Sequence, residues 1–119
     1  MGKALGFLEI SGVVAATDAL DLMCKAADVE FVTWEKKLGG RLVTVIVRGE
    51  VSAVTSAIEA AKAGAIKKPV STAVIANPHP EVERVVEKSR ARLLKARGEV
   101  EETVEVEPVK KTTSRKTKK

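Results

Sequence analysis

The stretch Val32–Glu50, VTWEKKLGGRLVTVIVRGE, decides the fold of this 119-residue chain. It contains Val43–Val47, an almost unbroken β-branched run that favours a central, largely buried strand. Phe31–Trp34 is a second β-favouring segment. The basic connection between the two contains Gly39 and Gly40, which permit positive φ and expose backbone N–H groups. The stretch therefore predicts a glycine-tipped hairpin at the centre of a sheet. The alternative is an ordinary solvent-exposed hairpin with charged flanks and no special function.

The rest of the chain predicts two further strands and three helices. Apolar residues recur at three- and four-residue intervals in each expected helix. The first residues of the three apolar faces are Val13, Val51 and Val82, and Val85 and Val86 continue the third face. The order strand, helix, strand, strand, helix, strand, helix predicts an α+β fold of the ferredoxin-like kind. Its four-stranded antiparallel sheet has helices on one face, plus an extended C-terminal helix. The remaining predicted elements are strands Ala4–Ile10 and Val70–Ala76 and helices Val13–Ala27, Glu50–Gly64 and Glu81–Gly98.

Composition divides the chain into a domain, residues 1–98, and an appendage, residues 99–119. The appendage starts with EVEETVEVEPV, whose alternating acidic and apolar residues fit either an edge strand or a linker. The last ten residues carry six basic groups and no acidic ones, so subtracting these six charges from the net +5 leaves −1 on the preceding 109 residues. We expect this basic tail to be disordered. It could contact nucleic acid, an acidic protein or a membrane face, or simply keep the protein in solution.

Catalytic and cofactor motifs are missing from the sequence. The only histidine, His79, lies between two prolines without a nucleophile or base in any recognisable pattern around it. The lone Cys24 excludes an internal disulfide and a multi-cysteine metal site, and we expect it to pack inside a helix. No metal-ligand spacing, phosphate loop or dinucleotide fingerprint occurs. We expect no signal peptide, and no apolar run in the sequence reaches membrane-spanning length. The sequence therefore predicts a cytoplasmic protein that is not an enzyme, without catalytic residues, cofactor or metal.

Three segments resemble the bacterial microcompartment shell-protein domain. They are ALGFLEISGVVAATDALDLMCKAADVEFV, WEKKLGGRLVTVIVRGEVSAVTSAIEAAKAGA and VIANPHPEVE, and they cover nearly all of Met1–Glu87. The motifs A-L-G-x-x-E, K-x-A at a helix end, E-K-x-x-G-G, V-T-V-I-V-R-G-E-V and P-H-x-x-V-E follow one another in the family's order. The resemblance implies cyclic homohexamers that tile into the facets of a protein shell in the cytoplasm. Implied partners are other shell proteins, enclosed enzymes and small polar metabolites, but neither a membrane nor nucleic acid.

The same resemblance assigns roles to particular positions. The hairpin turns of six subunits would line a central pore, through Lys37, Leu38, Gly39, Gly40 and Arg41. The edge of the hexamer would be formed by Lys25, Asn77 and His79. Two features depart from the family pattern: the turn is one residue longer than the commoner E-K-x-G-S-G-L-V-T, and Asn77 stands where many relatives have an arginine.

Interpretations from other classes remain open at this level. Lys25 lies near the end of a predicted helix, where a cation interacts favourably with the helix dipole, and this role needs no neighbour. The fold also suits a trimeric regulatory module that binds a small anion or nucleotide between subunits. A third possibility is binding of nucleic acid or another partner through Lys110–Lys119, which salt would weaken steeply.

Overall fold

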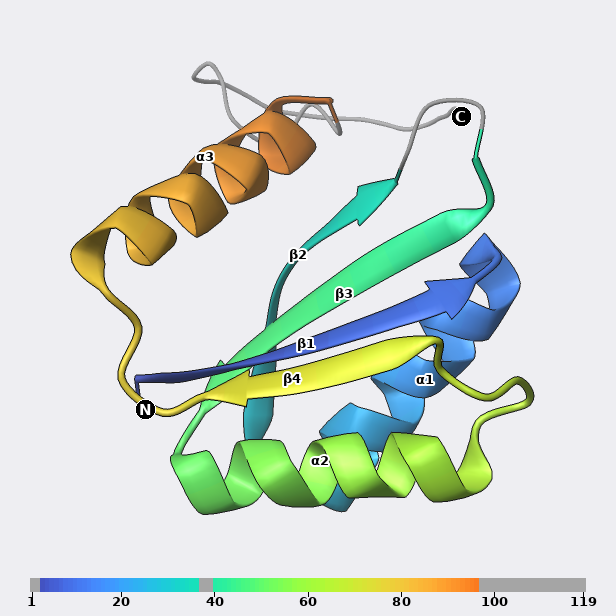
Figure 1. The fold of residues 1–119 in the computed structure, drawn as a ribbon. Coiled ribbons are helices and arrows are strands. Elements are labelled where there is room, and N and C mark those ends of the chain that lie inside the picture. Colours follow the sequence, from blue (N-terminus) through green and yellow to red (C-terminus); the bar gives the residue numbers. More distant parts are fainter. Residues whose placement is uncertain (1–2, 37–39, 97–119) are drawn as a thin grey trace, which may run out of the picture.

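The computed structural model describes residues 3–36 and 40–96 (Figure 1). Every predicted helix and strand is present there, with ends that differ from the predictions by no more than two residues. The elements are β1 Ala4–Ser11, α1 Val13–Ala26, β2 Val29–Lys36, β3 Leu42–Gly49, α2 Val51–Gly64, β4 Ser71–Ile75 and α3 Pro80–Ala96.

The four strands form one antiparallel sheet in the order β2-β3-β1-β4. The β-branched run therefore lies in β3, a central strand, as predicted, and β1 is the second central strand. Gly49 at the end of β3 pairs with Ala4 and with Val29, while Leu5 pairs with Ile75. The beginnings of β1 and β2 and the ends of β3 and β4 thus lie at one end of the sheet. The β2–β3 hairpin lies at the other end.

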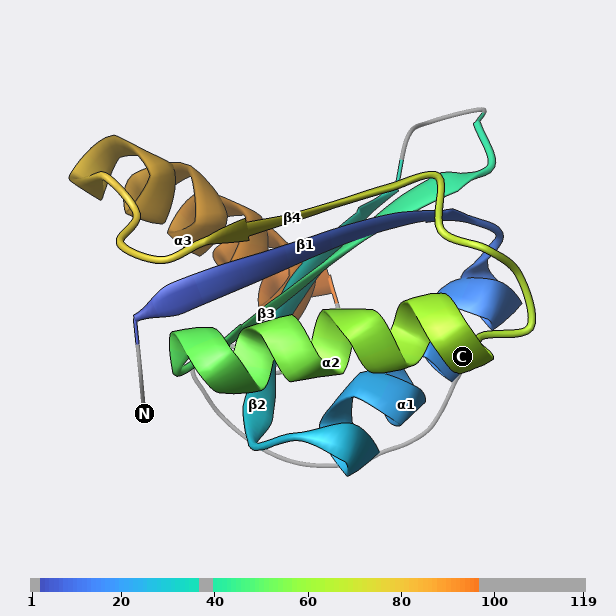
Figure 2. The same ribbon diagram turned by 60° about the horizontal axis from the view of Figure 1, so that its bottom comes forward.

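Helices α1 and α2 cover one face of this sheet (Figure 2). Alternate residues of the central strands, such as Leu8 and Val45, are fully buried against Met23 of α1 and Val54 of α2. The contact between α2 and β1 is so close at Gly6 that a Cβ atom there would lie 2.6 Å from a methyl group of Val54. Burial of these side chains supplies the main driving force for folding, and a side chain at position 6 would force Val54 to move.

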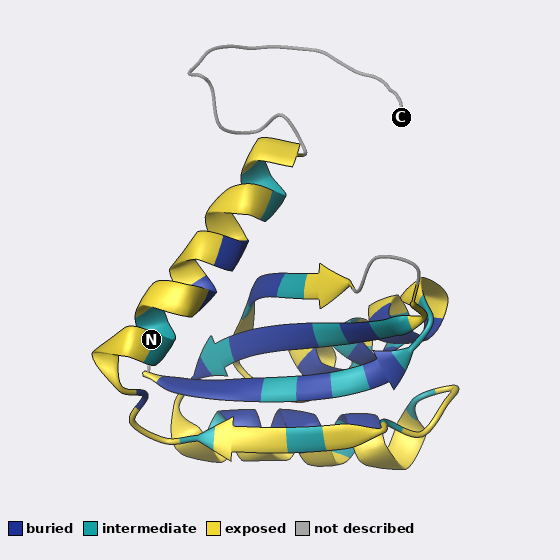
Figure 3. Ribbon diagram, turned by 45° about the horizontal axis from the view of Figure 1, so that its top comes forward, coloured by how far each residue is buried: buried dark blue, intermediate teal, exposed yellow. Residues whose placement is uncertain are grey.

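Helix α3 lies on the opposite face of the sheet (Figure 1). Val86 is buried with Leu5, Val32 and Ile46, which form a second and smaller core. Most of the outward surface of α3 is exposed, as Figure 3 shows. The prediction of helices on one face is confirmed for α1 and α2. The sequence left the position of α3 open, and the structure places it across the other face.

Some residues expected inside the protein lie on its surface. Val13 and Val51 are exposed because each is the first residue of its helix, and Val85 is 67% exposed on α3. The expectation that Cys24 packs inside a helix is wrong, because its side chain is exposed on α1. Small residues take the inward positions of α1 and α2 instead; the buried alanines are Ala15, Ala16, Ala19, Ala57 and Ala61.

Candidate pore and edge sites

The structure describes the β3 side of the hairpin that is predicted to line a pore. Gly40 and Arg41 are exposed there, just before β3 begins. The backbone carbonyl of Arg41 accepts a hydrogen bond of 2.7 Å from the N–H of Gly12, which has a φ of 98° at the start of α1. Glycine adopts this positive φ without strain, so the base of the hairpin is tied to the β1–α1 turn. The other predicted pore positions, Lys37, Leu38 and Gly39, lie outside the described residues.

Lys25 occupies the last turn of α1 and points into solvent. Its Nζ lies 2.9 Å from a carboxylate oxygen of Asp21, one turn earlier, and its side chain is 74% exposed. The hydrogen bond with Asp21, followed by the charge of Asp21, raises the pKa of Lys25. An exposed pair at this spacing contributes only a few tenths of a kcal/mol, about 0.3–0.5. The pair therefore orients the lysine more than it stabilises the helix.

His79 caps the start of α3. Its Nδ1 accepts a hydrogen bond of 3.0 Å from the N–H of Glu81, and its carbonyl accepts from the N–H groups of Val82 and Glu83. These acceptors satisfy N–H groups that the first turn of a helix leaves without intrahelical partners. Asn77 is exposed two residues earlier. A local role in the turn accounts for His79 without any catalytic partner.

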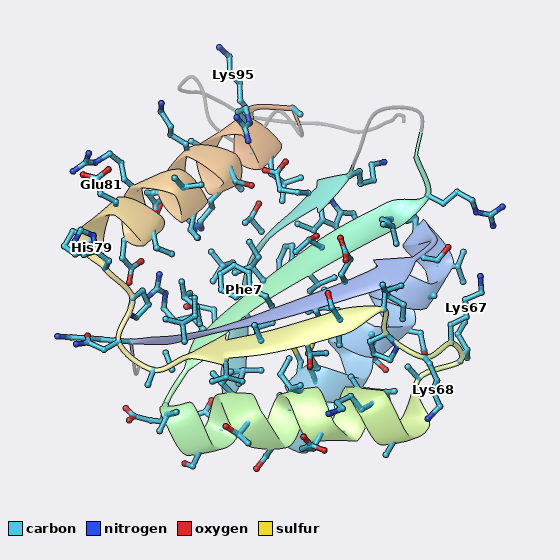
Figure 4. All side chains as sticks on the ribbon, in the orientation of Figure 1. Phe7, Lys67, Lys68, His79, Glu81 and Lys95 are labelled. Carbon is cyan, nitrogen blue, oxygen red and sulfur yellow. The ribbon has the colours of Figure 1, made fainter. Side chains whose placement is uncertain are left out.

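The two sets of predicted positions lie at opposite ends of the sheet. Lys25 precedes the start of β2, and Asn77 and His79 follow the end of β4, so all three belong to the end where β1 begins. Arg41 belongs to the hairpin end. Figure 4 shows His79 at one end of the molecule and Lys67, in the loop before β4, at the other. Within residues 3–36 and 40–96, no hydrogen bond or ion pair joins Lys25 to Asn77 or His79.

Comparison with known proteins identifies the family. The BMC domain model matches residues 4–78, which is more than half of the chain. The chain belongs to the BMC-domain family of bacterial microcompartment shell proteins. It is 44% identical over 88 residues to the bacterial microcompartment shell protein PduA of Citrobacter freundii, covering 72% of this chain and 94% of that protein.

Two further proteins that are similar to this chain support this assignment. The carboxysome shell protein CsoS1A of Hydrogenovibrio crunogenus is 46% identical over 89 residues, covering 71% of this chain and 91% of that protein. A microcompartments protein from Desulfitobacterium hafniense has a crystal structure that superposes with a TM-score of 0.63 at 26% identity. That match covers 75% of this chain and 49% of the other. The resemblance inferred from sequence motifs is confirmed, and with it the assignment as a structural protein of a microcompartment shell rather than an enzyme.

The BMC-domain match ends at residue 78, and α3 begins at Pro80. An ion pair fixes the first turn of this helix to the sheet. The guanidinium of Arg48 on β3 donates two hydrogen bonds to the carboxylate of Glu83, of 2.5 and 3.1 Å. The hydrogen bond is the main cause that lowers the pKa of Glu83 and raises that of Arg48. Sequence reasoning missed this pair, although Arg48 is the first charged residue after the β-branched run and Glu83 lies in the first turn of the helix.

A polar cluster joins the middle and end of α3 to β2. The hydroxyl of Ser89 donates to the carboxylate of Glu35 and lies 3.0 Å from the hydroxyl of Thr33. Arg92 donates to the same oxygen of Glu35 at 2.9 Å. The hydrogen bond from Ser89 is the largest of the effects that lower the pKa of Glu35. Desolvation opposes this lowering, and the hydrogen bond and charge of Arg92 add to it.

Within the described residues, no group of histidine, cysteine, aspartate or glutamate side chains is arranged to hold a metal ion. No helix in those residues is long and apolar enough to cross a membrane.

The lowered pKa of Glu83 predicts a pH-dependent stability. The carboxyl titrates at its ordinary value near 4.5 in the unfolded chain and lower in the folded protein. The stabilisation is therefore complete above pH 4.5 and is lost as the pH falls through the folded-state pKa. We expect Glu83→Gln to lower the free energy of unfolding by about 1 kcal/mol at neutral pH, and the difference from the unsubstituted protein to shrink below pH 4.5. Urea unfolding at a fixed protein concentration measures this.

Glu81→Gln is the matched control for this experiment. Glu81 lies in the same first turn of α3 and pairs with Arg84 of the same helix, not with the sheet. Both substitutions remove one negative charge near the helix N-terminus, so the dipole contribution cancels in the comparison. A loss in Glu83→Gln that equals the loss in Glu81→Gln at every pH would contradict a specific role for the Arg48 pair.

Proposed function

We propose that six copies of this chain form a closed ring that acts as a tile of the microcompartment shell. The hairpin, with Gly40 and Arg41, faces the axis of the ring and lines a pore for small polar metabolites. Lys25, Asn77 and His79 lie at the rim, where one ring meets the next. Other shell proteins are the partners at this rim, and enclosed enzymes lie behind the facet.

The observation that carries this proposal is the placement of the two candidate sites at opposite ends of one sheet. A pore-lining turn and an edge lysine on one subunit can serve a flat ring only if they are separated along its radius. The strand pairing provides this separation, since β2 and β3 run from the Lys25 end to the hairpin end. A heterologous contact repeated by rotation closes into a ring and presents its innermost turn once per subunit.

The composition of the hairpin suits polar and anionic cargo. Gly40 is exposed and has no side chain, so backbones from several subunits can approach closely there. Exposed N–H groups and the positive charge of Arg41 favour an anion or a polar solute near the axis. Two unit charges about 10 Å apart repel by roughly 1.7 kcal/mol at an effective dielectric constant of 20, so a ring of arginines favours an anion between them.

We further propose that the shell domain extends through α3 to residue 98 and that residues 99–119 form an appendage. The support is that α3 lies beyond the family match yet packs on the sheet through Val86 and the Arg48–Glu83 pair. The last ten residues of the appendage add six basic groups, none of which belongs to the predicted pore or rim positions.

Native mass tests the ring directly. Each chain has a mass of 12.7 kDa, so we expect about six times this value for the purified protein, with or without residues 110–119. The mass is measured by native mass spectrometry or light scattering at neutral pH. A trimer would favour the alternative of a regulatory module that binds a small ligand between subunits. A monomer would overturn both interpretations, and a mass that changes on removal of the tail would assign the tail a role in assembly.

A further inference from the structure

Helix α3 is fastened to the sheet at two places that differ in strength. At its start, Arg48 and Glu83 form a bidentate pair whose side chains are 23% and 36% exposed. Val82 and Val86 pack on Leu5 beside this pair. The first turns of α3 are therefore held by apolar contact and by a partly desolvated ion pair, which salt screens weakly.

The second half of α3 has a weaker attachment. The ion pair between Arg92 and Glu35 has side chains that are 70% and 47% exposed, so it lies in contact with solvent. Ser89 is the last buried residue of the helix, and its hydroxyl shares the carboxylate of Glu35. Exposed pairs of this kind contribute little and lose strength as salt rises.

A groove lies between α3 and the sheet and is only partly filled. Its volume is about 550 Å³, and its apolar lining includes Phe7 and Ile46 from the sheet and Val85 from the helix. Glu35 and Arg92 line the same groove. Figure 4 shows Phe7 in the middle of the sheet face, beside the helix. On the helix side the groove is lined mainly by the first half of α3, through Val82, Val85 and Val86, and Ser89 and Arg92 lie at its other end.

We propose that α3 is a strap that opens from its C-terminal end. Salt or loss of the Glu35–Arg92 pair releases Ser89–Ala96 from β2, while the Arg48–Glu83 pair keeps the first turns in place. Opening frees the end of the groove that Glu35, Ser89 and Arg92 line, while Val82 and Val86 stay packed on the sheet. Ionic strength thus controls access to the groove from its Glu35–Arg92 end. All of these contacts lie within one chain, so the strap does not depend on the proposed ring.

Hydrogen exchange of the full-length protein tests the strap. Glu35→Gln is expected to raise the exchange rates of the amides in Ser89–Ala96 about fivefold, while the amides before Val86 keep their rates. Raising NaCl from about 0.1 M to about 1 M shortens the Debye length from about 10 Å to about 3 Å and should have the same effect on the unsubstituted protein. In Glu35→Gln, salt should add little, because the screened pair is already absent.

Arg84→Gln is the matched control, and Arg92→Gln is the second test variant. Arg84 also forms an exposed ion pair, but with Glu81 of the same helix, so its loss should leave Ser89–Ala96 unchanged. Arg92→Gln should repeat the effect of Glu35→Gln even if the latter folds poorly. Equal acceleration along the whole of α3, or no acceleration in either variant, would overturn the strap.

Trp34 provides a second measurement. It is the only tryptophan of the chain. It packs against Phe31 and the core beneath α1 and α2, and it also lines a shallow depression with Ser89, Arg92 and Leu93. Opening should change its fluorescence emission over the same salt range in the unsubstituted protein and in Arg84→Gln, and much less in Arg92→Gln. An identical response of all three proteins would mean that salt acts elsewhere, and the strap would be rejected.

Discussion

Replacing Lys25 by alanine is expected to leave the proposed ring intact and to abolish extended sheets of rings. Lys25 lies at the end of the molecule far from the hairpin, with 74% of its side chain exposed and Asp21 as its only ion-pair partner among the described residues. Removing it costs the subunit no buried contact, so the native mass of a single ring should not change. The rim would lose a long side chain that is available to every neighbouring ring. Electron micrographs of the purified protein, together with its native mass, measure both effects.

Lys62→Ala is the control for this substitution. Lys62 also lies in the last turn of a helix and pairs with an acidic residue, Glu59, in its own helix. The two variants lose the same charge and the same kind of local pair, but only Lys25 belongs to the proposed rim. Sheets that persist in Lys25→Ala, or that vanish equally in Lys62→Ala, would contradict the edge assignment. Loss of the ring itself in Lys25→Ala would instead assign Lys25 to a contact between subunits of one ring.

The second large effect is expected from reversing the charge at the hairpin. Arg41→Glu changes the charge by two units on each subunit, and a ring repeats this change at its axis. Interactions of about 1.7 kcal/mol per pair of charges then oppose an anion instead of attracting it. We expect the affinity of the assembled protein for inorganic phosphate to fall more than tenfold, with a smaller fall at high salt. Titration followed by phosphorus NMR measures this affinity.

Lys3→Glu is the control for the hairpin variant. Lys3 is exposed and precedes β1, at the opposite end of the sheet from Arg41. Its reversal changes the net charge by the same amount without altering the hairpin. If phosphate binds equally well to both variants, Arg41 does not face a pore. If both variants bind it equally weakly, the affinity reflects net charge and not a site.

Local sequence patterns predicted most of the fold because each element carries its own periodicity. The β-branched run of β3 and the glycines beside it identified a central strand and a hairpin without reference to distant residues. Exceptions occur where tertiary position overrides periodicity. Val13 and Val51 match the apolar stripes of their helices but extend past the packed core, and alanines fill the inward positions because α1 and α2 lie close to the sheet.

The contacts that position α3 could not be predicted from the sequence. Arg48 and Glu83 are 35 residues apart, and Glu35 and Arg92 are 57 residues apart. Each looks like an ordinary surface charge until the fold brings it to its partner. The family motifs, in contrast, identified the family because they preserve order and spacing, and the roles of Lys25, Asn77 and the hairpin stay predictions. That order does not reveal which face of the sheet the last helix covers, since this depends on the tertiary contacts of Val86 and Glu83.

Gly6 has a consequence for the shape of anything built from many copies of this chain. The missing side chain lets Val54 and Ile58 rest directly on β1, and this sets the distance between α2 and the sheet at the middle of the molecule. A methyl group at this position would force Val54, or the helix that carries it, to shift. In a single protein, packing nearby can absorb such a change. In a repeating layer, every unit makes the same adjustment, so a small local misfit accumulates as curvature of the whole surface.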